Sequence, residues 1–455
     1  MKKNSEINMT RGPLLPELLQ FVLPLTFSSL LQIAFNAADL IVVGHFGRPY
    51  AMAAVGANTA LINLIITVLL GLATGGGVLC SRYYGARLED MVREAVSSTI
   101  VVGLIGGVIT GVVGLCLAVP LLELSGSPDE VLPLAAVYLR IYFIGLPAMA
   151  LYNFAASALR ALGNTKQPLI YLIVAGIINV ILNLFFVIVI GIDVAGVAIA
   201  TVISQCVSGV LTLRFLLRSQ GMKIADIKLS RSMLSRILKI GIPAGLQGAL
   251  FSISNFIIQA SVNSFGAAAI AGASASASVE AMLYCPQDAV MQAATTAVSQ
   301  NVGAQNYDRT RKVCRESIFL GTVITGVMCA LAVVFRREVL GLYTSDEAEL
   351  EYAIARLLIL GTTNVLDLPM TVLSGVNRGL GYSLLPAIVT FVGACLLRIV
   401  WVYTVFAAVR TLEILYISYP ITWTITALAH LVCYFIIRKK PFRKTLEKNA
   451  EPVNA

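Results

Sequence analysis

Residues 95–119 read AVSSTIVVGLIGGVITGVVGLCLAV, an unbroken run of apolar and small residues without a charged side chain. A helix of about twenty such residues crosses the hydrocarbon core of a bilayer, because it satisfies its own backbone hydrogen bonds without water. The run does not alternate between apolar and polar residues, which argues against a strand of a membrane β-barrel. This stretch therefore predicts a transmembrane helix.

The composition of the whole chain agrees with that stretch. Of its 455 residues, 58% are hydrophobic and 13% are charged, and the mean hydropathy is +0.85. Soluble proteins have about a quarter of their residues charged. Half that fraction leaves too few polar groups to cover a water-facing surface, so we expect an all-α integral membrane protein.

Runs of spanning length recur along the chain, mostly separated by polar breaks. We expect twelve spans, at 16–44, 52–80, 95–119, 131–156, 167–191, 194–217, 237–264, 268–298, 317–335, 352–376, 383–408 and 413–437. The break before 194–217 rests only on Asp193 and its flanking glycines. Long runs such as 16–44 are expected to include interfacial turns.

The basic residues predict the orientation of these spans. With the N-terminus inside, 26 of the 33 Lys and Arg residues fall in inside segments and six, Arg356 among them, fall in outside segments. Arg398 falls within a span. Because Lys and Arg are retained on the cytoplasmic side, both termini are predicted to be cytoplasmic. A multi-pass protein of the cell inner (plasma) membrane is expected.

The two halves of the chain repeat each other. A shift of about 218 residues aligns Ser81–Ala86 (SRYYGA) with Ser299–Ala304 (SQNVGA) and Arg160 with Arg378. An even number of spans in each half inserts both halves the same way up, which relates them by an axis along the membrane normal. We therefore expect two pseudo-symmetric six-helix lobes.

The expected division of the chain follows from this repeat. It runs as a cytoplasmic arm at 1–15, an N-lobe at 16–217, a cytoplasmic linker at 218–236, a C-lobe at 237–437 and a basic cytoplasmic tail at 438–455. Such duplication suits alternating access, in which two lobes rock around a site between them.

The sequence lacks the motifs that are typical of several function classes. No phosphate-binding G-x-x-x-x-G-K-[ST] occurs, and neither H-E-x-x-H nor G-x-S-x-G is present, so an enzyme is not expected. The cysteines form no C-x-x-C pair, so neither a structural metal site nor a disulfide framework is expected. The net charge of +9 is spread over short loops and ends, which argues against nucleic acid as a partner. We expect no cofactor and a monomer in contact with membrane lipid.

Asp39 is the strongest candidate for a coupling site. It lies late in the first span, with Asn36 about one turn before it, and an ionisable group within a span is costly. A carboxylate held there can bind a proton or a sodium ion; the alternative is an Asp that caps a helix or lies at the interface. Asn179 and Asn183 share one face of the fifth span, where they either partner Asp39 or join helices.

Candidates for a substrate cavity lie in both halves, beginning with Asn36 in the first span. In the fourth span Tyr138, Tyr142, Tyr152 and Asn153 form a polar, aromatic face or an interfacial belt. In the second half the candidates are Glu280, Gln287, Asp288, Met291, Asp367 and Arg398. Acidic, aromatic and methionine side chains suit bulky organic cations. Arg398 is expected to pair with one of the acids.

These residues resemble the multidrug and toxic compound extrusion (MATE) family over about 15–437. The resemblance rests on Asn36-x-x-Asp39-x-x-x-x-Gly44-x-x-Gly47, Gly85-Ala86-Arg87, Arg160-Ala-Leu-Gly163-Asn-Thr-Lys-Gln-Pro168, Ser299-Gln-Asn-Val-Gly-Ala-Gln305 and Asn377-Arg378-Gly-Leu-Gly381. It implies an antiporter that exports small organic, often cationic and amphiphilic, compounds while protons or sodium ions enter.

The resemblance also implies roles for single residues. The cation site of prokaryotic relatives maps to Asp39, with Tyr138, Asn179, Asn183 and Thr201 around it. Relatives often carry an aspartate at the position of Asn183, and one fewer carboxylate leaves open whether the ion is a proton or sodium. The acid of the seventh span in the sodium-coupled branch has no counterpart in 240–264, whereas Asp367 and Glu280 match acids of the tenth and eighth spans.

Three alternatives remain at the level of sequence. A flippase or exporter of lipid-linked or other amphiphilic metabolites would need a large, basic cavity. A channel would need no alternation between states. An intramembrane enzyme would need a clustered nucleophile and base.

Overall fold

The computed structural model describes residues 7–437, and all regular structure in this part of the chain is helical. The main helices are α1 (Leu14–Phe46), α2 (Ala51–Gly85), α3 (Glu89–Leu124), α4 (Leu132–Ala161), α5 (Lys166–Leu184), α6 (Asp193–Ser219), α7 (Arg231–Asn263), α8 (Ala267–Gly303), α9 (Tyr307–Val334), α10 (Arg336–Leu340), α11 (Glu347–Thr363), α12 (Asp367–Gly379), α13 (Leu384–Thr390), α14 (Leu397–Trp401) and α15 (Leu412–Ile437). Single turns of other helix types extend or join them: η1 (Phe185–Ile190), η2 (Ile224–Asp226), η3 (Asn364–Leu366), η4 (Phe391–Leu396) and η5 (Val402–Phe406).

Twelve helical segments of the described chain are long and apolar enough to cross a membrane, which confirms the predicted spans. The break before Asp193 is confirmed, because α6 begins there. The first span contains no interfacial turn: α1 is one helix of 33 residues with Pro24 inside it. Two spans are interrupted, one by η3 between α11 and α12, the other by η4 and η5 around α14. Helices that outrun the bilayer thickness accommodate their length by tilting.

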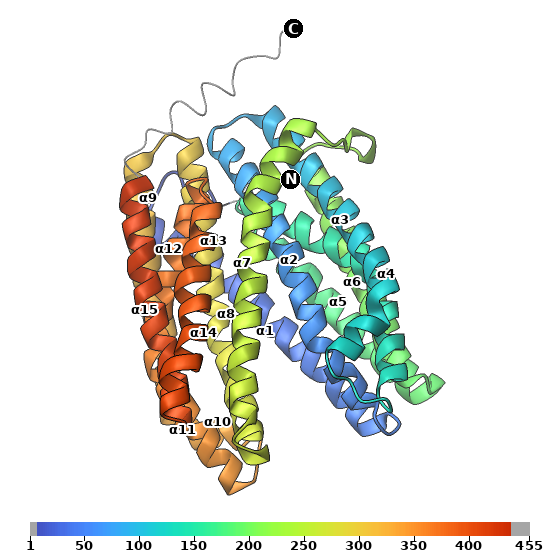
Figure 1. Ribbon diagram of the computed structural model, residues 1–455. Coiled ribbons are helices and arrows are strands. Elements are labelled where there is room, and N and C mark those ends of the chain that lie inside the picture. Colours follow the sequence, from blue (N-terminus) through green and yellow to red (C-terminus); the bar gives the residue numbers. More distant parts are fainter. Residues whose placement is uncertain (1–6, 438–455) are drawn as a thin grey trace.

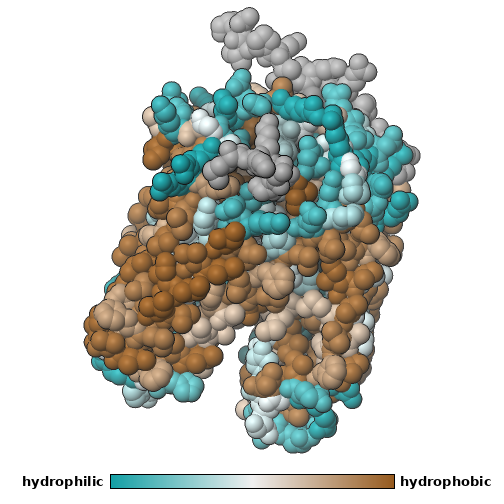
Figure 2. Space-filling model, turned by 180° about the vertical axis from the view of Figure 1, so that it is seen from behind, coloured by the Kyte–Doolittle hydropathy of each residue, from teal (hydrophilic) through white to brown (hydrophobic). Residues whose placement is uncertain are grey.

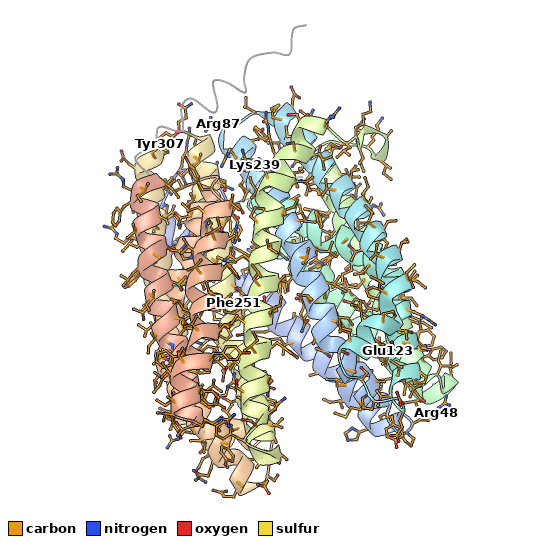
Figure 3. The ribbon with its side chains drawn as sticks, viewed as in Figure 1. Arg48, Arg87, Glu123, Lys239, Phe251 and Tyr307 are labelled. Atoms are coloured by element: carbon orange, nitrogen blue, oxygen red, sulfur yellow. The ribbon has the colours of Figure 1, made fainter. Side chains whose placement is uncertain are left out.

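The spans form two lobes that diverge toward one end of the molecule (Figure 1). We name the end at which Arg87, Lys239 and Tyr307 lie the closed end, and the end at which Arg48 lies the open end (Figure 3). Figure 2 shows a cleft between the lobes at the open end and, on the face in view, a hydrophobic band across both lobes between more polar ends. Both lobes thus present an apolar belt to lipid, and the cleft opens at one end only.

The repeated motif closes the other end. A Cβ atom at Gly85 would collide with the backbone oxygen of Gln300, and one at Gly303 would collide with the backbone oxygen of Arg82. Because the repeat aligns Arg82 with Gln300 and Gly85 with Gly303, the two contacts are related by the pseudo-twofold axis. The absence of a side chain lets α2 and α8 cross backbone to backbone.

The N-terminal part of the first helix in each lobe packs against the opposite lobe. Leu14 and Phe21 of α1 belong to a core cluster with Val298 of the C-lobe. Met233 and Ile237 of α7 belong to a cluster built mostly from α2, α3, α4 and α6. The sequence repeat does not predict this exchange, which makes α1 and α7 part of both lobes.

Two loop assignments need correction. The segment that joins the lobes outside a main helix is 220–230, because α7 already begins at Arg231, inside the predicted linker of 218–236. Arg356 is not in an outside loop: it lies within α11 and only 6% of its surface is exposed. The tail at 438–455 and the first six residues of the arm lie outside the described residues.

Candidate functional site

Asp39 lies in the last third of α1, buried between α5 and α6, with 7% of its surface exposed. Its Oδ1 accepts a hydrogen bond of 2.5 Å from Nδ2 of Asn183. Its Oδ2 lies 3.5 Å from the hydroxyl of Thr201, which lies closer, at 3.0 Å, to the backbone oxygen of Val197. A hydroxyl has one proton to donate. Oδ2 is therefore the less committed oxygen of this carboxylate.

The two asparagines complete a closed ring of polar contacts around Asp39. Nδ2 of Asn183 also donates to Oδ1 of Asn179 at 3.2 Å, and Nδ2 of Asn179 donates to Oγ1 of Thr201 at 3.2 Å. The ring thus joins three helices through one carboxylate, two amides and one hydroxyl. Of the two readings left open by the sequence, Asn183 partners Asp39 directly, Asn179 reaches it only through Asn183 and Thr201, and the same bonds also join helices.

The aromatic residues of α4 lie in the protein interior. Tyr138 is 5% and Tyr142 is 9% exposed, and their rings stack with centroids 6.3 Å apart. The hydroxyl of Tyr142 donates to Sδ of Met149, and Tyr152 donates to the backbone oxygen of Pro168. Side chains of an interfacial belt would be exposed at the membrane surface, so that reading is wrong for these tyrosines.

Two predicted cavity residues of the N-lobe lie apart from the ring. Asn36 is exposed, although it lies only about one turn before Asp39. Asn153 is half-buried and donates its amide to the backbone oxygen of Met149 on its own helix. Tyr138 forms no hydrogen bond to Asp39 in the described structure, but it packs in the same core cluster as Val43 of α1.

Glu280 of α8 has both carboxylate oxygens committed. Arg356 donates from Nε to Oε1 at 2.8 Å and from Nη2 to Oε2 at 2.9 Å, and Ser276 donates to Oε1 at 2.8 Å. The guanidinium also lies 5.3 Å from the centroid of the Tyr416 ring. A bidentate ion pair of this kind is strong, and its two parallel hydrogen bonds fix the relative orientation of the side chains. Glu280 is therefore neutralised within the C-lobe.

Arg398 is not the ion-pair partner that the sequence suggested. It is fully buried, its Nη1 donates to Oδ1 of Asn255 at 3.0 Å, and its Nη2 donates to Oγ1 of Thr422 at 3.4 Å. Its guanidinium lies 4.0 Å from the ring centroid of Tyr419. Neutral oxygens and an aromatic face hold this charge, and among the described residues it forms no ion pair with an acid.

Asp367 opens α12 directly after the break at η3 and is 5% exposed. Its Oδ2 accepts from the hydroxyl of Thr371 at 3.2 Å, whereas Oδ1 has no hydrogen-bond partner among the described residues. Beside the break, Nε2 of Gln287 donates to Oδ1 of Asn364. The break thus gathers one buried acid and two buried amides near the middle of the interrupted span.

One face of α8 points toward the N-lobe. Oε1 of Gln292 accepts from Nη1 of Arg160 in α4 at 3.1 Å, so this face spans the gap between the lobes. Asp288 lies one turn earlier on the same face and is exposed, whereas Met291 is half-buried. Asp288 is the exposed acid among the C-lobe candidates.

Sequence reasoning missed Arg356 and Asn364. The signal for Arg356 was present, because a charged residue inside the predicted span 352–376 needs a buried partner. The signal for Asn364 was weaker, since a single asparagine in an apolar span also serves to join helices.

The chain is similar in sequence to a known family in each of its two halves, in agreement with the two-lobe fold. The MatE family model matches residues 24–185 and again residues 243–404. The probable multidrug resistance protein YoeA of Bacillus subtilis is 27% identical over 442 residues, covering 94% of this chain and 95% of its own.

Solved structures share the fold. A MOP superfamily transporter from Pyrococcus furiosus superposes with a TM-score of 0.89 at 22% identity, covering 97% of this chain and all of its own. A structure described as the outward-facing conformation of a multidrug resistance MATE family transporter superposes with a TM-score of 0.88 at 22% identity, covering 98% of this chain and all of its own. The double family match, together with twelve spans in two pseudo-symmetric lobes, leads to one conclusion: the chain belongs to the MatE family of multidrug efflux transporters.

Proposed function

We propose that this protein is a secondary antiporter that exports organic cations in exchange for protons or sodium ions. The observation that carries the proposal is the ring around Asp39, a lone buried carboxylate held by neutral groups, in a molecule whose cleft opens at one end only. The closed end faces the cytoplasm of the cell that carries the protein in its inner (plasma) membrane, and the described conformation is the outward-facing one.

Coupling begins at Oδ2 of Asp39, the oxygen with the weaker hydrogen bond. A proton bound there turns Oδ2 into a donor to the Thr201 hydroxyl, which itself donates to Val197, and leaves Oδ1 as an uncharged and weaker acceptor for Asn183. Those contacts tie α1 to α5 and α6, and the other end of α1 packs against the C-lobe. Cation uptake at Asp39 thereby changes the position of one lobe relative to the other.

A proton is the preferred coupling ion. The ring carries one carboxylate, because residue 183 is an asparagine. An aspartate at this position would add a second negative charge and favour a metal cation. Proton binding needs Asp39 alone, whereas a sodium ion would have to recruit oxygen atoms from Asn179, Asn183 and Thr201 as well. Measuring efflux under each gradient separately distinguishes the two ions.

Organic cations are the expected substrates because an exposed acid lies between the lobes, beside the contact of Arg160 with Gln292. Asp288 is exposed on the face of α8 that points toward the N-lobe, while Glu280 is already paired and Arg398 is fully buried. Exported amphiphilic anions, as for a flippase of lipid-linked precursors, would require the opposite charge at this surface.

The test is coupled efflux by Asp39→Asn in reconstituted vesicles. With a pH or sodium gradient imposed, we expect the variant to retain binding of a fluorescent organic cation and to lose gradient-driven transport. Asp193→Asn is the matched control, because Asp193 is a buried acid of the same lobe that pairs with Arg48 at the open end. Full coupled transport by Asp39→Asn would refute the proposal.

A further inference from the structure

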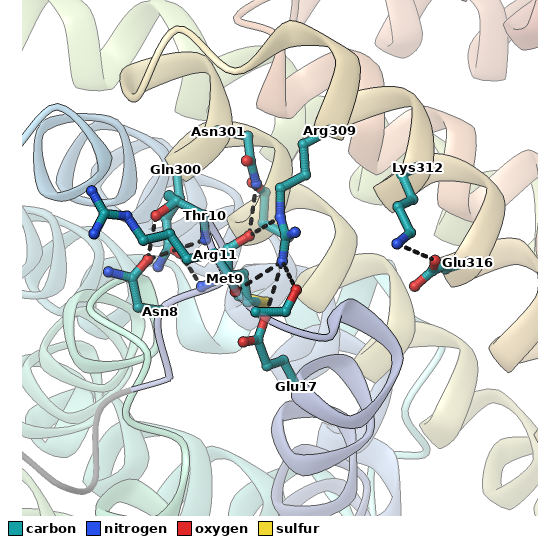
Figure 4. Close-up of polar contacts among 12 residues, drawn as sticks. Asn8, Met9, Thr10, Arg11, Glu17, Gln300, Asn301, Arg309, Lys312 and Glu316 are labelled. Carbon is teal, nitrogen blue, oxygen red and sulfur yellow. Dashed lines mark hydrogen bonds and ion pairs between the residues drawn. The ribbon is translucent and has the colours of Figure 1, made fainter.

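The residues before α1 are held by Gln300, Asn301 and Arg309 of the C-lobe (Figure 4) and also contact the turn between α4 and α5. We call Ile7–Gly12 the N-terminal strap. The backbone N–H of Ile7 donates to the oxygen of Gly163, in the turn between α4 and α5, at 3.0 Å. Gly163 has φ +85°, and a Cβ atom there would collide with the backbone oxygen of Ile7. The turn therefore needs glycine both for its backbone conformation and for the approach of the strap.

Met9 fixes the middle of the strap to the C-lobe. Its side chain is fully buried in a core cluster with Val298 and Val302. Its N–H donates to Oε1 of Gln300 at 3.1 Å, and its carbonyl oxygen accepts from Nδ2 of Asn301 at 3.0 Å. The repeated motif at the end of α8 thus binds the strap through two side-chain amides.

Arg309 of α9 forms hydrogen bonds with the rest of the strap. Its Nε donates to the oxygen of Met9 at 2.9 Å, and its Nη2 lies 2.9 Å and 3.0 Å from the oxygens of Arg11 and Gly12. Nη2 also pairs with Oε2 of Glu17 in the first turn of α1 at 3.3 Å. One charged side chain therefore holds three backbone carbonyl groups, those of Met9, Arg11 and Gly12, in a segment without helical hydrogen bonds.

Contacts to the N-lobe complete a bridge. Besides the bond from Ile7 to Gly163, Nε2 of Gln300 donates to the oxygen of Ala161, the last residue of α4, at 3.0 Å. Gln300 is also the residue whose backbone meets Gly85 where α2 and α8 cross. The strap and the crossing therefore lie side by side, and both join the lobes at the closed end.

The segment before α7 is the counterpart of the strap in the repeat, and it binds differently. Lys228 exchanges hydrogen bonds of 2.5 Å and 2.8 Å with the hydroxyl of Ser97, and the N–H of Ser230 donates to Ser98 at 3.2 Å. These partners both belong to α3. The segment before α7 is docked on one lobe, whereas the strap contacts both.

We infer that the N-terminal strap is a latch that stabilises the closed end. Met9 and Arg309 anchor it to the C-lobe, and its bond from Ile7 to Gly163 breaks when the lobes part at this end, as does the neighbouring bond from Gln300 to Ala161. The inference rests on the alternating access proposed above, because only a transporter that opens at this end needs a releasable contact there. Arg309 is then a positioning residue that shifts the equilibrium between the state closed at this end and the state open at this end.

The test is hydrogen–deuterium exchange of the full-length protein in lipid nanodiscs, without any ion gradient. In Arg309→Gln we expect backbone amides in 79–86 and 159–164 to exchange at least about fivefold faster, the lower range of conformational coupling between sites. Arg311→Gln is the matched control, because Arg311 lies on the same helix, is exposed and, among residues 7–437, pairs only with Asp308. Equal exchange in the two variants, or faster exchange spread evenly over all spans, would overturn the latch.

A second pair of variants acts from the N-lobe side. Gly163→Ala should displace Ile7 and speed exchange in the same two segments. Gly126→Ala controls for backbone strain, because Gly126 also has a positive φ of 76° but open space around it. Unchanged exchange at the closed end in Gly163→Ala would contradict the inference. Since no gradient is used, a failed latch is distinguishable from a failed coupling site at Asp39.

Discussion

Asp39 in the N-lobe and Glu280 in the C-lobe are both buried acids of transmembrane helices, but their partners differ in kind. Asp39 is held by amides and a hydroxyl, and one of its oxygens is weakly bound. Glu280 is held by the guanidinium of Arg356 and by Ser276, and both of its oxygens are used. A buried acid with neutral partners can exchange a cation, whereas one with a fixed cation beside it contributes to the architecture.

The largest effect is expected from breaking the pair in the C-lobe. Arg356→Met leaves Glu280 buried without a counter-charge and should lower the free energy of unfolding by about 3 to 5 kcal/mol. Denaturation of the purified protein, followed by circular dichroism, measures the change. The double variant with Glu280→Gln should recover most of the loss. A loss below about 1 kcal/mol in the single variant would mean that the pair is not an architectural contact.

The next effect comes from making the two sites differ more in charge, by adding a second carboxylate beside Asp39. Asn183→Asp places a second carboxylate against Asp39, and two such groups cannot both be ionised without a cation between them. We expect efflux driven by a sodium gradient alone to rise about tenfold, a change of about 1.4 kcal/mol. Dye efflux at equal pH on both sides measures it. No gain in sodium-driven transport would argue against the ring as the ion site.

A smaller effect is expected from opening the ring without changing its charge. Thr201→Val keeps the shape of the side chain and removes the hydroxyl that joins Asn179 to Asp39. The loss of one neutral hydrogen bond is worth about 1 kcal/mol, so we expect proton-driven efflux to fall about fivefold. Thr212→Val, on the same helix but bonded only to Ser208, is the control and should transport normally.

The smallest effect is expected at the open end. Arg48 pairs with Asp193 at 2.6 Å, but 75% of the arginine side chain is exposed. Water and salt screen such a pair, so Arg48→Gln should change the free energy of unfolding by about 0.5 kcal/mol or less. Comparison with Arg356→Met in the same denaturation assay would then show that burial decides the strength of an ion pair here.

The sequence was sufficient for the spans and for the shared face of Asn179 and Asn183, because both depend on local patterns. Thr201 was implied only by the resemblance to the family. Hydropathy alone marks a helix that must cross lipid, and a spacing of four residues places Asn179 and Asn183 on one face. The repeat also predicted two lobes, which the paired family match and the fold confirm.

Pairing over long distances was beyond the sequence. Nothing in the order of residues joins Glu280 to Arg356 rather than to Arg398, because the choice depends on how α8, α11 and α14 pack. Arg398 shows the same limit, since an asparagine, a threonine and an aromatic ring replace the acid it was expected to find. The exchange of α1 and α7 between lobes likewise depends on tertiary packing.

The crossing of α2 and α8 at Gly85 and Gly303 has a mechanical consequence. Two surfaces that meet through main-chain atoms have no rotamers to reset when they part, so separation and return release and recover almost no side-chain entropy. On the alternating access proposed above, this crossing therefore parts at little cost in side-chain entropy, and the ring at Asp39 and the N-terminal strap would set the rate of each cycle.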